Sequence, residues 1–511
     1  LIEKKTRESL KETMQQNYAF ISEEMQRSDW FSVYINSFVS QYDPNTSYLD
    51  PESKDRFDVD MSGNYAGIGA RLQKKIDKVE ITEVISGGPA WRDNILEKGD
   101  AILKVRQDNE DEPVGILNMR LSEAVKLIKG KKGTKVHLTV KKVDGTVTEV
   151  TVKRDIVLLE ETYIKSSIVE KDNNTYGLIN IPKFYIDFDN QSNRDAAKDL
   201  RTEIERLKEQ GIQGLVIDLR NNGGGALKTV VDMAGMFIKN GPVVQVKYFD
   251  KEKQVLSDRD RSVLWTGPLV ILVNEGSASA SEILAAAMQD YKRAIIIGGN
   301  QTWGKGTVQN VFPLNRMVRG NTNGDLGALR YTTQKYYRIN GGSVQLEGVK
   351  SDINVPYRYK YLEFGEKDSE NPLQWDEIDK VEFDTWNSNF NFEEAITKSN
   401  KRMANNEYLK LVDENAKWIK SVRDNKLINL NYDKFKLELE ENSSITEKFK
   451  ALNDYSMNYS FKSLPYELDL IKNDSVLGLK RERWHKSLNK DFYIDEALNV
   501  LSDLRFSYLD N

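Results

Sequence analysis

The chain has 511 residues, of which 39% are hydrophobic and 30% are charged, and its net charge is −5. This length exceeds a single core, so several domains are expected, and the near balance of charge argues against a nucleic-acid-binding protein. Cysteine is absent, which excludes disulfides and thiolate metal sites, and no apolar run approaches the ~20 residues that span a bilayer. The chain opens in a charged stretch without methionine, so we expect it to be part of a longer precursor.

Three of four expected regions are defined by simple patterns. Residues 1–60 are predicted to be helical, because apolar residues from Trp30 to Val39 recur at the spacing of one helix face. Residues 61–157 change to short strands with glycine turns and one amphipathic helix, which predicts a small, partly open β-barrel. Residues 359–511 are polar, poor in proline and predicted to be mostly helical.

The remaining region, residues 158–358, alternates strands, turns and helices, which is typical of an α/β domain. The expected strands and helices of its central part are 215–219, 226–238, 269–273, 279–290 and 294–297. The turns between them carry the candidate chemistry, so we expect the functional groups to lie where buried strands end.

Two glycine-rich turns contain a serine and a lysine that together suit nucleophilic catalysis. Ser279 lies in the first turn, and the second reads Trp303-Gly304-Lys305-Gly306. The chain has only two histidines, His137 and His485, and structural or surface roles are expected for both. A hydrolase with a side-chain nucleophile would therefore need a lysine as its base.

Competing motifs fail at single residues. Residues 299–306 nearly match a phosphate-binding loop, but Gly306 stands where magnesium needs a hydroxyl residue, and 307–311 alternates like a strand instead of opening a helix. The stretch 67–69 misses the dinucleotide fingerprint because Leu72 replaces a required small residue. The zinc-protease pattern H-E-x-x-H is absent, so no metal and no cofactor is expected.

Local sequence leaves two interpretations of each central residue. Ser279 and Glu282 fit a capping box, in which the serine only starts a helix. The same position also suits a nucleophile, because the amide of Ala280 at a helix N-terminus would stabilise an oxyanion. Lys305 is either a solvated surface charge or a base that its glycine and tryptophan neighbours shield from water, since desolvation favours a neutral lysine.

The ordered motifs resemble those of the carboxy-terminal processing peptidases, also called tail-specific proteases, from about Trp30 to the end of the chain. Residues 218–225 (DLRNNGGG) look like the first core motif of that family, 277–282 (SASASE) like its nucleophile turn and 303–309 (WGKGTVQ) like its base motif. Residues 65–69 (YAGIG) look like the carboxylate-binding loop of a PDZ domain.

The resemblance implies a multidomain α/β fold. A crotonase-like α/β protease core, residues 158–358, would carry an inserted PDZ domain, residues 61–157. An N-terminal helical region, residues 1–60, would precede them, and a C-terminal helical domain, residues 359–511, would follow.

The resemblance also assigns roles to matching residues. Ser279 would be the nucleophile, Lys305 the general base and Gln309 the residue that orients Lys305. The remaining roles are the oxyanion hole, formed by the amides of Ala280 and of Gly225 or Gly224, and the PDZ carboxylate site, formed by Tyr65, Ala66, Gly67, Ile68 and Gly69. An acidic third member maps to Asp290, but eleven helical residues place it ~16 Å from Ser279, so a structural role is expected.

Two departures from the family pattern concern turns near these residues. The loop 298–302 is one residue longer than usual before the base motif, which would shift Lys305. Ser351 replaces the usual proline in a later turn, which should only loosen it.

Two functions remain as hypotheses. The first is a serine endopeptidase with a Ser-Lys dyad that cleaves proteins recognised by apolar C-terminal tails. By resemblance it would act in the periplasm or cell envelope of a bacterium, without nucleic acid or metal, and an adaptor protein is left open as a further partner. The alternative is a catalytically inactive scaffold whose PDZ domain binds protein C-termini. The joint presence of Ser279, Lys305 and Gln309 favours the peptidase.

Overall fold

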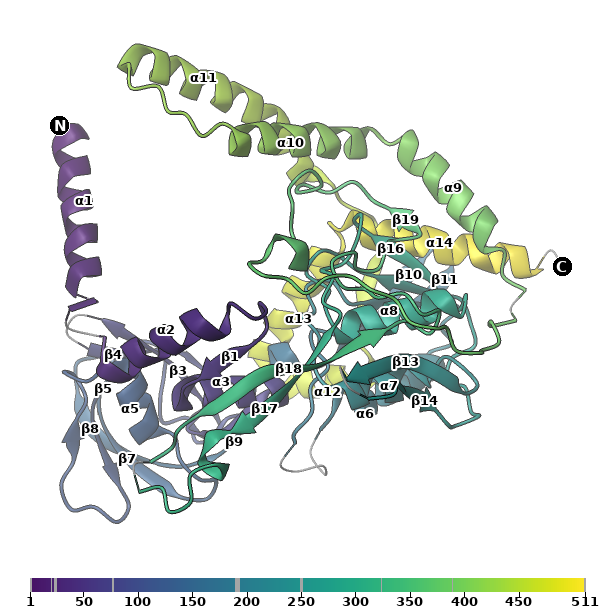
Figure 1. The fold of residues 1–511 in the computed structure, drawn as a ribbon. Coiled ribbons are helices and arrows are strands. Elements are labelled where there is room, and N and C mark those ends of the chain that lie inside the picture. The colour runs from purple at the N-terminus through teal and green to yellow at the C-terminus, as the bar shows by residue number, and fades with distance from the viewer. Residues whose placement is uncertain are drawn as a thin grey trace. The chain divides into compact units, whose positions relative to one another are not determined.

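A computed structural model describes residues 2–19, 21–22, 25–75, 78–188, 194–248, 251–322, 324–387 and 389–509. These residues cluster into two compact units, Leu1–Glu160 with Gln309–Thr332, and Glu161–Val308 with Thr333–Asn511. Figure 1 traces the elements of both units by colour along the chain.

The first unit begins with helices whose ends follow from local sequence. Its helices and first strand are α1 (Ile2–Ala19), α2 (Arg27–Val39), β1 (Ser47–Leu49) and α3 (Pro51–Ser62). Asp50 caps α3 by accepting the Ser53 amide at 3.0 Å, and Pro51 takes the first helical position, where its missing N–H costs nothing. Gly63 ends the helix with φ 71°, a left-handed conformation that glycine adopts without strain.

The rest of this unit is mainly a small sheet with strand order β3-β4-β5-β7-β8, to which β6 adds beside β5. Strands β2 and β9 form a separate pair. The elements are β2 (Asn64–Gly67), β3 (Ala70–Lys75), β4 (Lys78–Val84), α4 (Pro89–Arg92), β5 (Ala101–Gln107), β6 (Val114–Gly115), α5 (Leu121–Ile128), β7 (Lys135–Lys141), β8 (Val147–Lys153) and β9 (Asp155–Leu158). Alternating buried residues of β4 and β7 build its core, while β3 lies at one end of the strand order.

The second unit is built on a seven-stranded sheet with order β19-β16-β15-β12-β11-β10-β20. Strands β11, β12, β15, β16 and β19 run parallel, and β10 is antiparallel to both of its neighbours, β11 and β20. The strands are β10 (Lys165–Lys171), β11 (Asn174–Asn180), β12 (Leu215–Asp218), β15 (Leu269–Leu272), β16 (Ile295–Gly298), β19 (Ile353–Asn354) and β20 (Ser460–Lys462). The central strands are continuous apolar runs because both faces of the sheet are covered.

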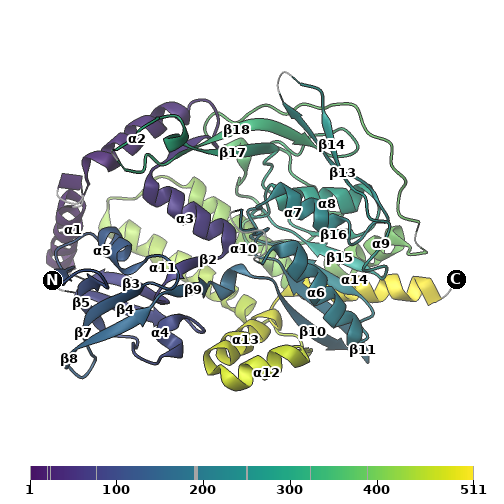
Figure 2. The same ribbon diagram turned by 90° about the horizontal axis from the view of Figure 1, so that it is seen from below.

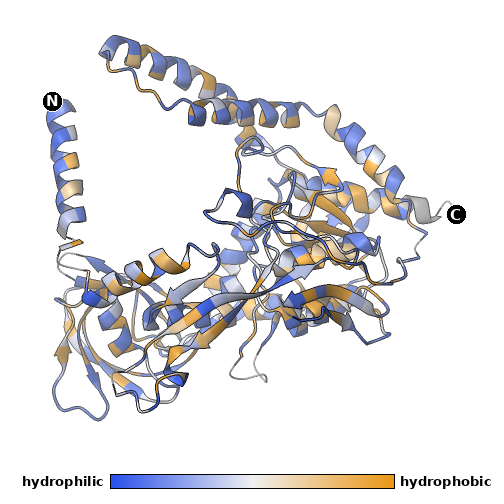
Figure 3. Cartoon of the chain, in the orientation of Figure 1, coloured by the Kyte–Doolittle hydropathy of each residue, from blue (hydrophilic) through white to orange (hydrophobic). Residues whose placement is uncertain are grey.

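Helices from distant parts of the chain cover the two faces. Helices α6 (Ala196–Glu209), α7 (Leu227–Ala234) and α8 (Ala280–Asp290) pack on the face that includes Leu215 and Ile217. Helices α9 (Phe392–Ala404) and α14 (Phe492–Leu509) pack on the opposite face, which includes Val216. Figure 2 labels these helices beside the strands in a second view, and Figure 3 colours the same elements by hydropathy, with hydrophobic residues in the strands.

The remaining elements are a second sheet and further C-terminal helices. Strand β18 pairs with β1 through its residues 328–330 and with β13 through its residues 334–337. These elements are β13 (Gly241–Tyr248), β14 (Gln254–Asp258), β17 (Thr307–Pro313), β18 (Ala328–Tyr337), α10 (Glu407–Asp424), α11 (Tyr432–Phe449), α12 (Pro465–Asn473) and α13 (Ser475–Leu488). Within the described residues, no helix combines the length and apolarity needed to cross a membrane.

The expected fold class, a multidomain α/β chain with helical terminal regions, is confirmed. The helix expected over 226–238 is shorter, however, because α7 ends at Ala234 with Gly235 as its C-cap. A Cβ at Gly235 would lie 2.6 Å from the Asp258 carboxyl carbon, so glycine here lets β14 approach the helix end. The four domain boundaries remain a prediction.

Candidate active site

Ser279 lies where β15 turns into α8, and its backbone is unusual for a helix cap. An N-cap residue normally has an extended backbone, whereas Ser279 has φ 56° and ψ −111°. Such conformations cost about 1–3 kcal/mol and concentrate at functional sites. Ser279 is partly exposed between the buried Ala278 and Ala280. The predicted capping box is present, but it does not by itself require this strained backbone.

The Glu282 carboxylate joins the turn that contains Ser279, residues 274–282 (the serine turn), to the turn that contains Lys305, residues 303–306 (the lysine turn). Its Oε2 accepts the backbone N–H of Ser279 at 2.7 Å and that of Lys305 at 3.0 Å. Its Oε1 accepts the Gly304 N–H at 2.7 Å and the Thr302 hydroxyl at 2.6 Å. Two nitrogens bound to one oxygen cannot lie more than about 6 Å apart, so the backbones of Ser279 and Lys305 are neighbours.

The Tyr336 hydroxyl binds the same two residues from their carbonyl side. It donates to the Lys305 carbonyl oxygen at 2.6 Å and lies 3.2 Å from the Ser279 carbonyl oxygen. Tyr336 is 1% exposed, so water does not compete for these contacts. A backbone bond from the Trp303 N–H to the Ser277 carbonyl, 3.0 Å long, ties the turns together a third time. We call these contacts of Glu282 and Tyr336 the double clamp.

Burial governs the charge of Glu282. The residue is completely buried, which raises the pKa of its carboxyl from 4.5 to about 7, against the opposing effect of its hydrogen bonds. An ionised carboxylate only accepts hydrogen bonds, whereas a protonated one must donate from one oxygen. The donors around Glu282 therefore suit the ionised form, which predominates above about pH 7.

Gly224 and Gly225 lie beside the serine turn. A Cβ at Gly224 would be 2.8 Å from Ser279 Cβ, and its φ of 103° also favours glycine. The Gly224 N–H already donates to Asn222 Oδ1 at 2.9 Å. The amides of Gly225 and Ala280 have no hydrogen-bond partner among the described residues. Of the two candidate glycines, Gly225 is thus the one with an amide available to an oxyanion.

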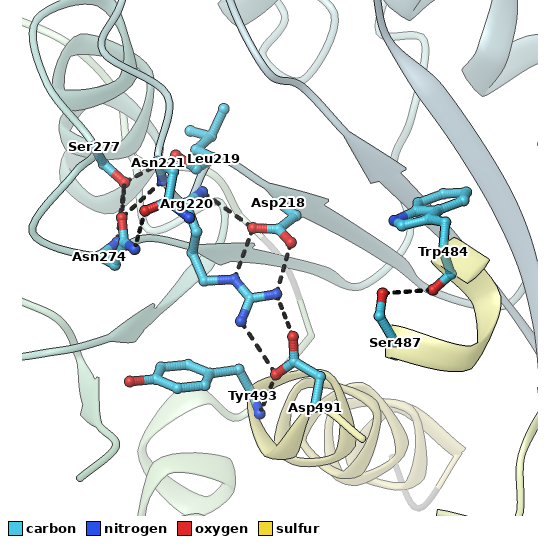
Figure 4. A network of polar contacts seen from close by, with 10 residues as sticks. All are labelled: Asp218, Leu219, Arg220, Asn221, Asn274, Ser277, Trp484, Ser487, Asp491 and Tyr493. Carbon is cyan, nitrogen blue, oxygen red and sulfur yellow. Dashed lines mark hydrogen bonds and ion pairs between the residues drawn. The ribbon is translucent and has the colours of Figure 1, made fainter. Parts of the chain in front are cut away.

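Polar contacts join the glycine loop, residues 221–225, to the serine turn (Figure 4). Asn274 Oδ1 accepts the Asn221 N–H at 2.8 Å, and Asn274 Nδ2 donates to Asn221 Oδ1 at 2.9 Å. The Ser277 hydroxyl donates to the Leu219 carbonyl at 2.9 Å. These bonds fix the loop relative to Ser279 without involving the Ser279 side chain.

The lysine turn depends on close backbone packing. A Cβ at Gly304 would lie 2.9 Å from the Leu346 carbonyl carbon, and one at Gly306 would lie 2.8 Å from the Gln345 nitrogen. Lys305 between them is partly exposed. The preceding loop, residues 298–302, is anchored because the Thr302 hydroxyl donates to Glu282 and accepts the Val349 N–H at 2.8 Å.

Other predicted residues take different positions. Gln309, on β17, belongs to the first compact unit, where its Nε2 donates to Thr332 Oγ1 at 3.2 Å. Its role in orienting Lys305 remains a prediction. Asp290 ends α8 and binds Arg338 at 2.6 Å and Asn340 at 2.9 Å, which favours the expected structural role. Burial raises the pKa of its carboxyl.

The predicted carboxylate loop, residues 65–69, is partly a strand, because its first three residues belong to β2, which pairs with β9, and only Ile68 and Gly69 lead from β2 into β3. Ile68 is 3% exposed and belongs to the core, and Gly69 has φ 79°. A Cβ at Gly69 would lie 3.1 Å from the Gly88 Cα, so glycine is needed for this close approach. The loop therefore ends at the start of a strand that lies at one end of its sheet.

Neither histidine belongs to the elements of the serine turn. His137 lies on β7, where it contacts Thr151 at 2.8 Å and Asp108 at 3.1 Å, and His485 lies in α13. Across the described part of the chain, no cluster of three acidic or histidine side chains is placed to hold a metal ion.

The sequence analysis identified Glu282 only as a cap residue, and it assigned no role in the site to Tyr336 or Thr302. The capping-box spacing did identify the contact between Glu282 and Ser279. The other partners of Glu282 lie 20 to 23 residues further along the chain, beyond any local pattern.

The raised pKa of Glu282 predicts a pH-dependent contribution to stability. Because the folded protein holds this proton more tightly than the unfolded chain, the contribution is complete below about pH 4.5 and is lost as pH rises through about 7. Its full size is ~3 kcal/mol. In urea unfolding, the free energy of unfolding of the wild type should fall between pH 5 and pH 8, and the Glu282→Gln variant should lack this part of the decline. Identical pH slopes in the two proteins would contradict the assignment.

The backbone of Ser279 predicts an unusual effect of glycine. Ser279→Ala and Ser279→Gly both remove the hydroxyl, but only glycine relieves the positive φ. After allowing for the greater freedom of glycine in the unfolded chain, the glycine variant should be the more stable by about 1 kcal/mol. Thermal unfolding of the matched pair measures this difference. An alanine variant at least as stable as the glycine variant would show that the turn is not strained.

Four family models match the chain. They are peptidase family S41 at residues 175–355, the PDZ domain at 58–141, the tail-specific protease N-terminal domain at 1–52 and the C-terminal domain of tail specific protease at 359–505. The matches cover the serine turn, the lysine turn and the carboxylate loop.

Curated relatives agree with these models. A tail-specific protease of Haemophilus influenzae is 36% identical over 93% of this chain, and the carboxy-terminal processing protease CtpA of Bacillus subtilis is 33% identical over 61%. The chain spans 65% and 61% of the lengths of these two proteins. A probable CtpA-like serine protease of Staphylococcus haemolyticus is 30% identical, with 90% of this chain and 77% of that protein covered. The chain therefore belongs to peptidase family S41, in the group of tail-specific and carboxy-terminal processing proteases.

Proposed function

We propose that the chain is a serine endopeptidase that uses Ser279 and Lys305 to cleave proteins recognised by their C-terminal tails. The observation that carries this proposal is the double clamp, in which Glu282 binds the N–H groups of Ser279 and Lys305 and Tyr336 contacts their carbonyls. A scaffold that only binds C-termini has no need for a strained serine held next to a lysine. Family membership supports the same conclusion, and so do the amides of Ala280 and Gly225, which are able to donate hydrogen bonds to an oxyanion.

In the proposed reaction, neutral Lys305 accepts the proton of the Ser279 hydroxyl as Oγ attacks the scissile carbonyl carbon. The oxyanion that forms accepts hydrogen bonds from the amides of Ala280 and Gly225. The C–N bond then breaks, and the ammonium of Lys305 gives its proton to the departing amine. Lys305 next activates a water molecule, which hydrolyses the acyl-enzyme and restores Ser279. Gln309 would orient Lys305 during both halves of the reaction.

The PDZ domain would supply tail recognition. The amides of residues 65–69 would bind the terminal carboxylate, and the tail would pair with β3, whose position at one end of the sheet order suits an added strand. Apolar terminal side chains are the expected preference. The family resemblance supports a location in the periplasm or cell envelope of a bacterium as part of this proposal, with an adaptor protein as a further candidate partner.

Replacement of the proposed pair should abolish cleavage without abolishing binding. Ser279→Ala and Lys305→Ala should each lower kcat/KM by at least about 1,000-fold, because the nucleophile or its base is lost. The measurement is cleavage of a folded reporter protein with an apolar C-terminal tail, alongside binding of the same tail. Asp290→Asn, a substitution in the same helix as Ser279, serves as the control and should bind the tail like the wild type. Activity surviving in Lys305→Ala would overturn the mechanism, and tail binding without turnover by the wild type would favour the scaffold.

Tail recognition predicts sensitivity to the terminal charge. A peptide with a free carboxylate should bind about 10- to 100-fold more tightly than its C-terminally amidated form, since hydrogen bonds to a charged group contribute about 1.5–3 kcal/mol. Calorimetric titration of the Ser279→Ala variant with both peptides measures the ratio while preventing cleavage. Equal affinities would show that the carboxylate is not what the PDZ domain binds.

A further inference from the structure

We propose that Asp491, at the start of α14 in the C-terminal helical region, is a positioning residue for the glycine loop and acts through Arg220. This inference rests on the proposed function, in that it takes the Gly225 amide as an oxyanion donor. It assigns to the C-terminal region a part in catalysis besides its packing against the sheet.

Arg220 is held between two carboxylates by paired hydrogen bonds. On one side its Nε and Nη2 donate to Asp218 at 2.9 and 2.7 Å. On the other side Nη1 and Nη2 donate to Asp491 at 3.1 and 2.7 Å (Figure 4). The planar guanidinium suits such two-sided, paired binding, which fixes its direction as well as its charge. The ring of Tyr493 lies 5.1 Å from the guanidinium carbon and adds a third contact.

Asp491 is itself firmly anchored. Its Oδ1 accepts the Tyr493 N–H at 2.9 Å, so it also caps the first turn of α14. That helix buries Ile494, Leu498 and Leu501 against the sheet face that includes Val216. The carboxylate is therefore fixed to the body of the core through a packed helix and not through a surface loop.

Arg220 precedes the glycine loop directly. The next residue, Asn221, has φ 59°, a conformation uncommon for a residue other than glycine, and its N–H binds Asn274 in the serine turn. A shift of Arg220 would therefore reach Asn221 at once and the Gly225 amide four residues later. Asp218 ends the central strand β12 and fixes one side of the guanidinium. Asp491 supplies the paired hydrogen bonds on the other side, from outside that segment.

The charges of this cluster favour its staying assembled. Arg220 and Asp218 are largely buried, with 15% and 9% of their side chains exposed. Without the Asp491 charge, Arg220 stays paired with Asp218 but loses the paired hydrogen bonds on its other side. Asparagine at position 491 would also set an NH2 donor against a guanidinium N–H, so Arg220 and the loop that follows it should shift.

Asp491→Asn tests the proposal, with Asp503→Asn as a matched control. Asp503 is also on α14 and pairs with Arg402 at 2.6 Å, but it lies ~18 Å further along the helix from Asp491. Cleavage of a quenched fluorescent peptide by the full chain should show kcat lowered at least about 10-fold in Asp491→Asn with KM within about twofold of the wild type, because loss of a whole oxyanion donor costs about 100- to 1,000-fold. Asp503→Asn should keep both constants within about twofold, although both variants lose an ion pair of α14.

Hydrogen exchange distinguishes a local effect on the glycine loop from a general loss of stability, which would speed exchange throughout the second unit. Exchange of the segment 219–226 should be faster in Asp491→Asn than in the wild type and unchanged in Asp503→Asn. A kcat within twofold of the wild type in Asp491→Asn, or an equal loss in Asp503→Asn, overturns the proposal. If Asp491→Asn does not fold, Arg220→Lys replaces it, because lysine keeps the positive charge but cannot make the paired hydrogen bonds, and a wild-type kcat in that variant also overturns the proposal. Activity of Ser279→Ala in the same assay would instead refute the proposed function.

Discussion

One buried carboxylate, that of Glu282, holds the candidate site together. Its two oxygens accept hydrogen bonds from a helix start and from a loop more than twenty residues away. Burying a carboxylate is costly, and these bonds offset the cost only while the turns stay in place. The geometry of the turns and the charge of Glu282 therefore depend on each other.

As a result, burial and the hydrogen bonds of the site favour different protonation states of Glu282. Burial favours the protonated form of Glu282, whereas the surrounding donors are all used only by the ionised form. Tyr336 reinforces the arrangement from the carbonyl side and carries no charge under the same conditions, since burial raises the pKa of its hydroxyl well above the ordinary value. A charged and a neutral group thus restrain the same two residues in complementary ways.

Local signals predicted those parts of the fold that depend on neighbouring residues. Buried strands such as 215–218 appear as apolar runs, and close packing explains the glycines beside the pair, since Gly224 approaches Ser279 and Gly304 flanks Lys305. Tyr336 could not be predicted, because it lies 57 residues from Ser279, and Asp491 lies 271 residues from Arg220. No periodicity or spacing connects residues so far apart, since only the folded sheet and its helices bring them together.

The strained backbone of Ser279 has a consequence for how related sequences change with time. Selection for folding alone would favour glycine at this position, because glycine adopts a positive φ without steric cost. A descendant that had abandoned the reaction would therefore gain stability by the very substitution that removes the hydroxyl. Glycine in place of serine at the start of α8 would identify descendants that have lost the activity, even where every other motif residue was still in place.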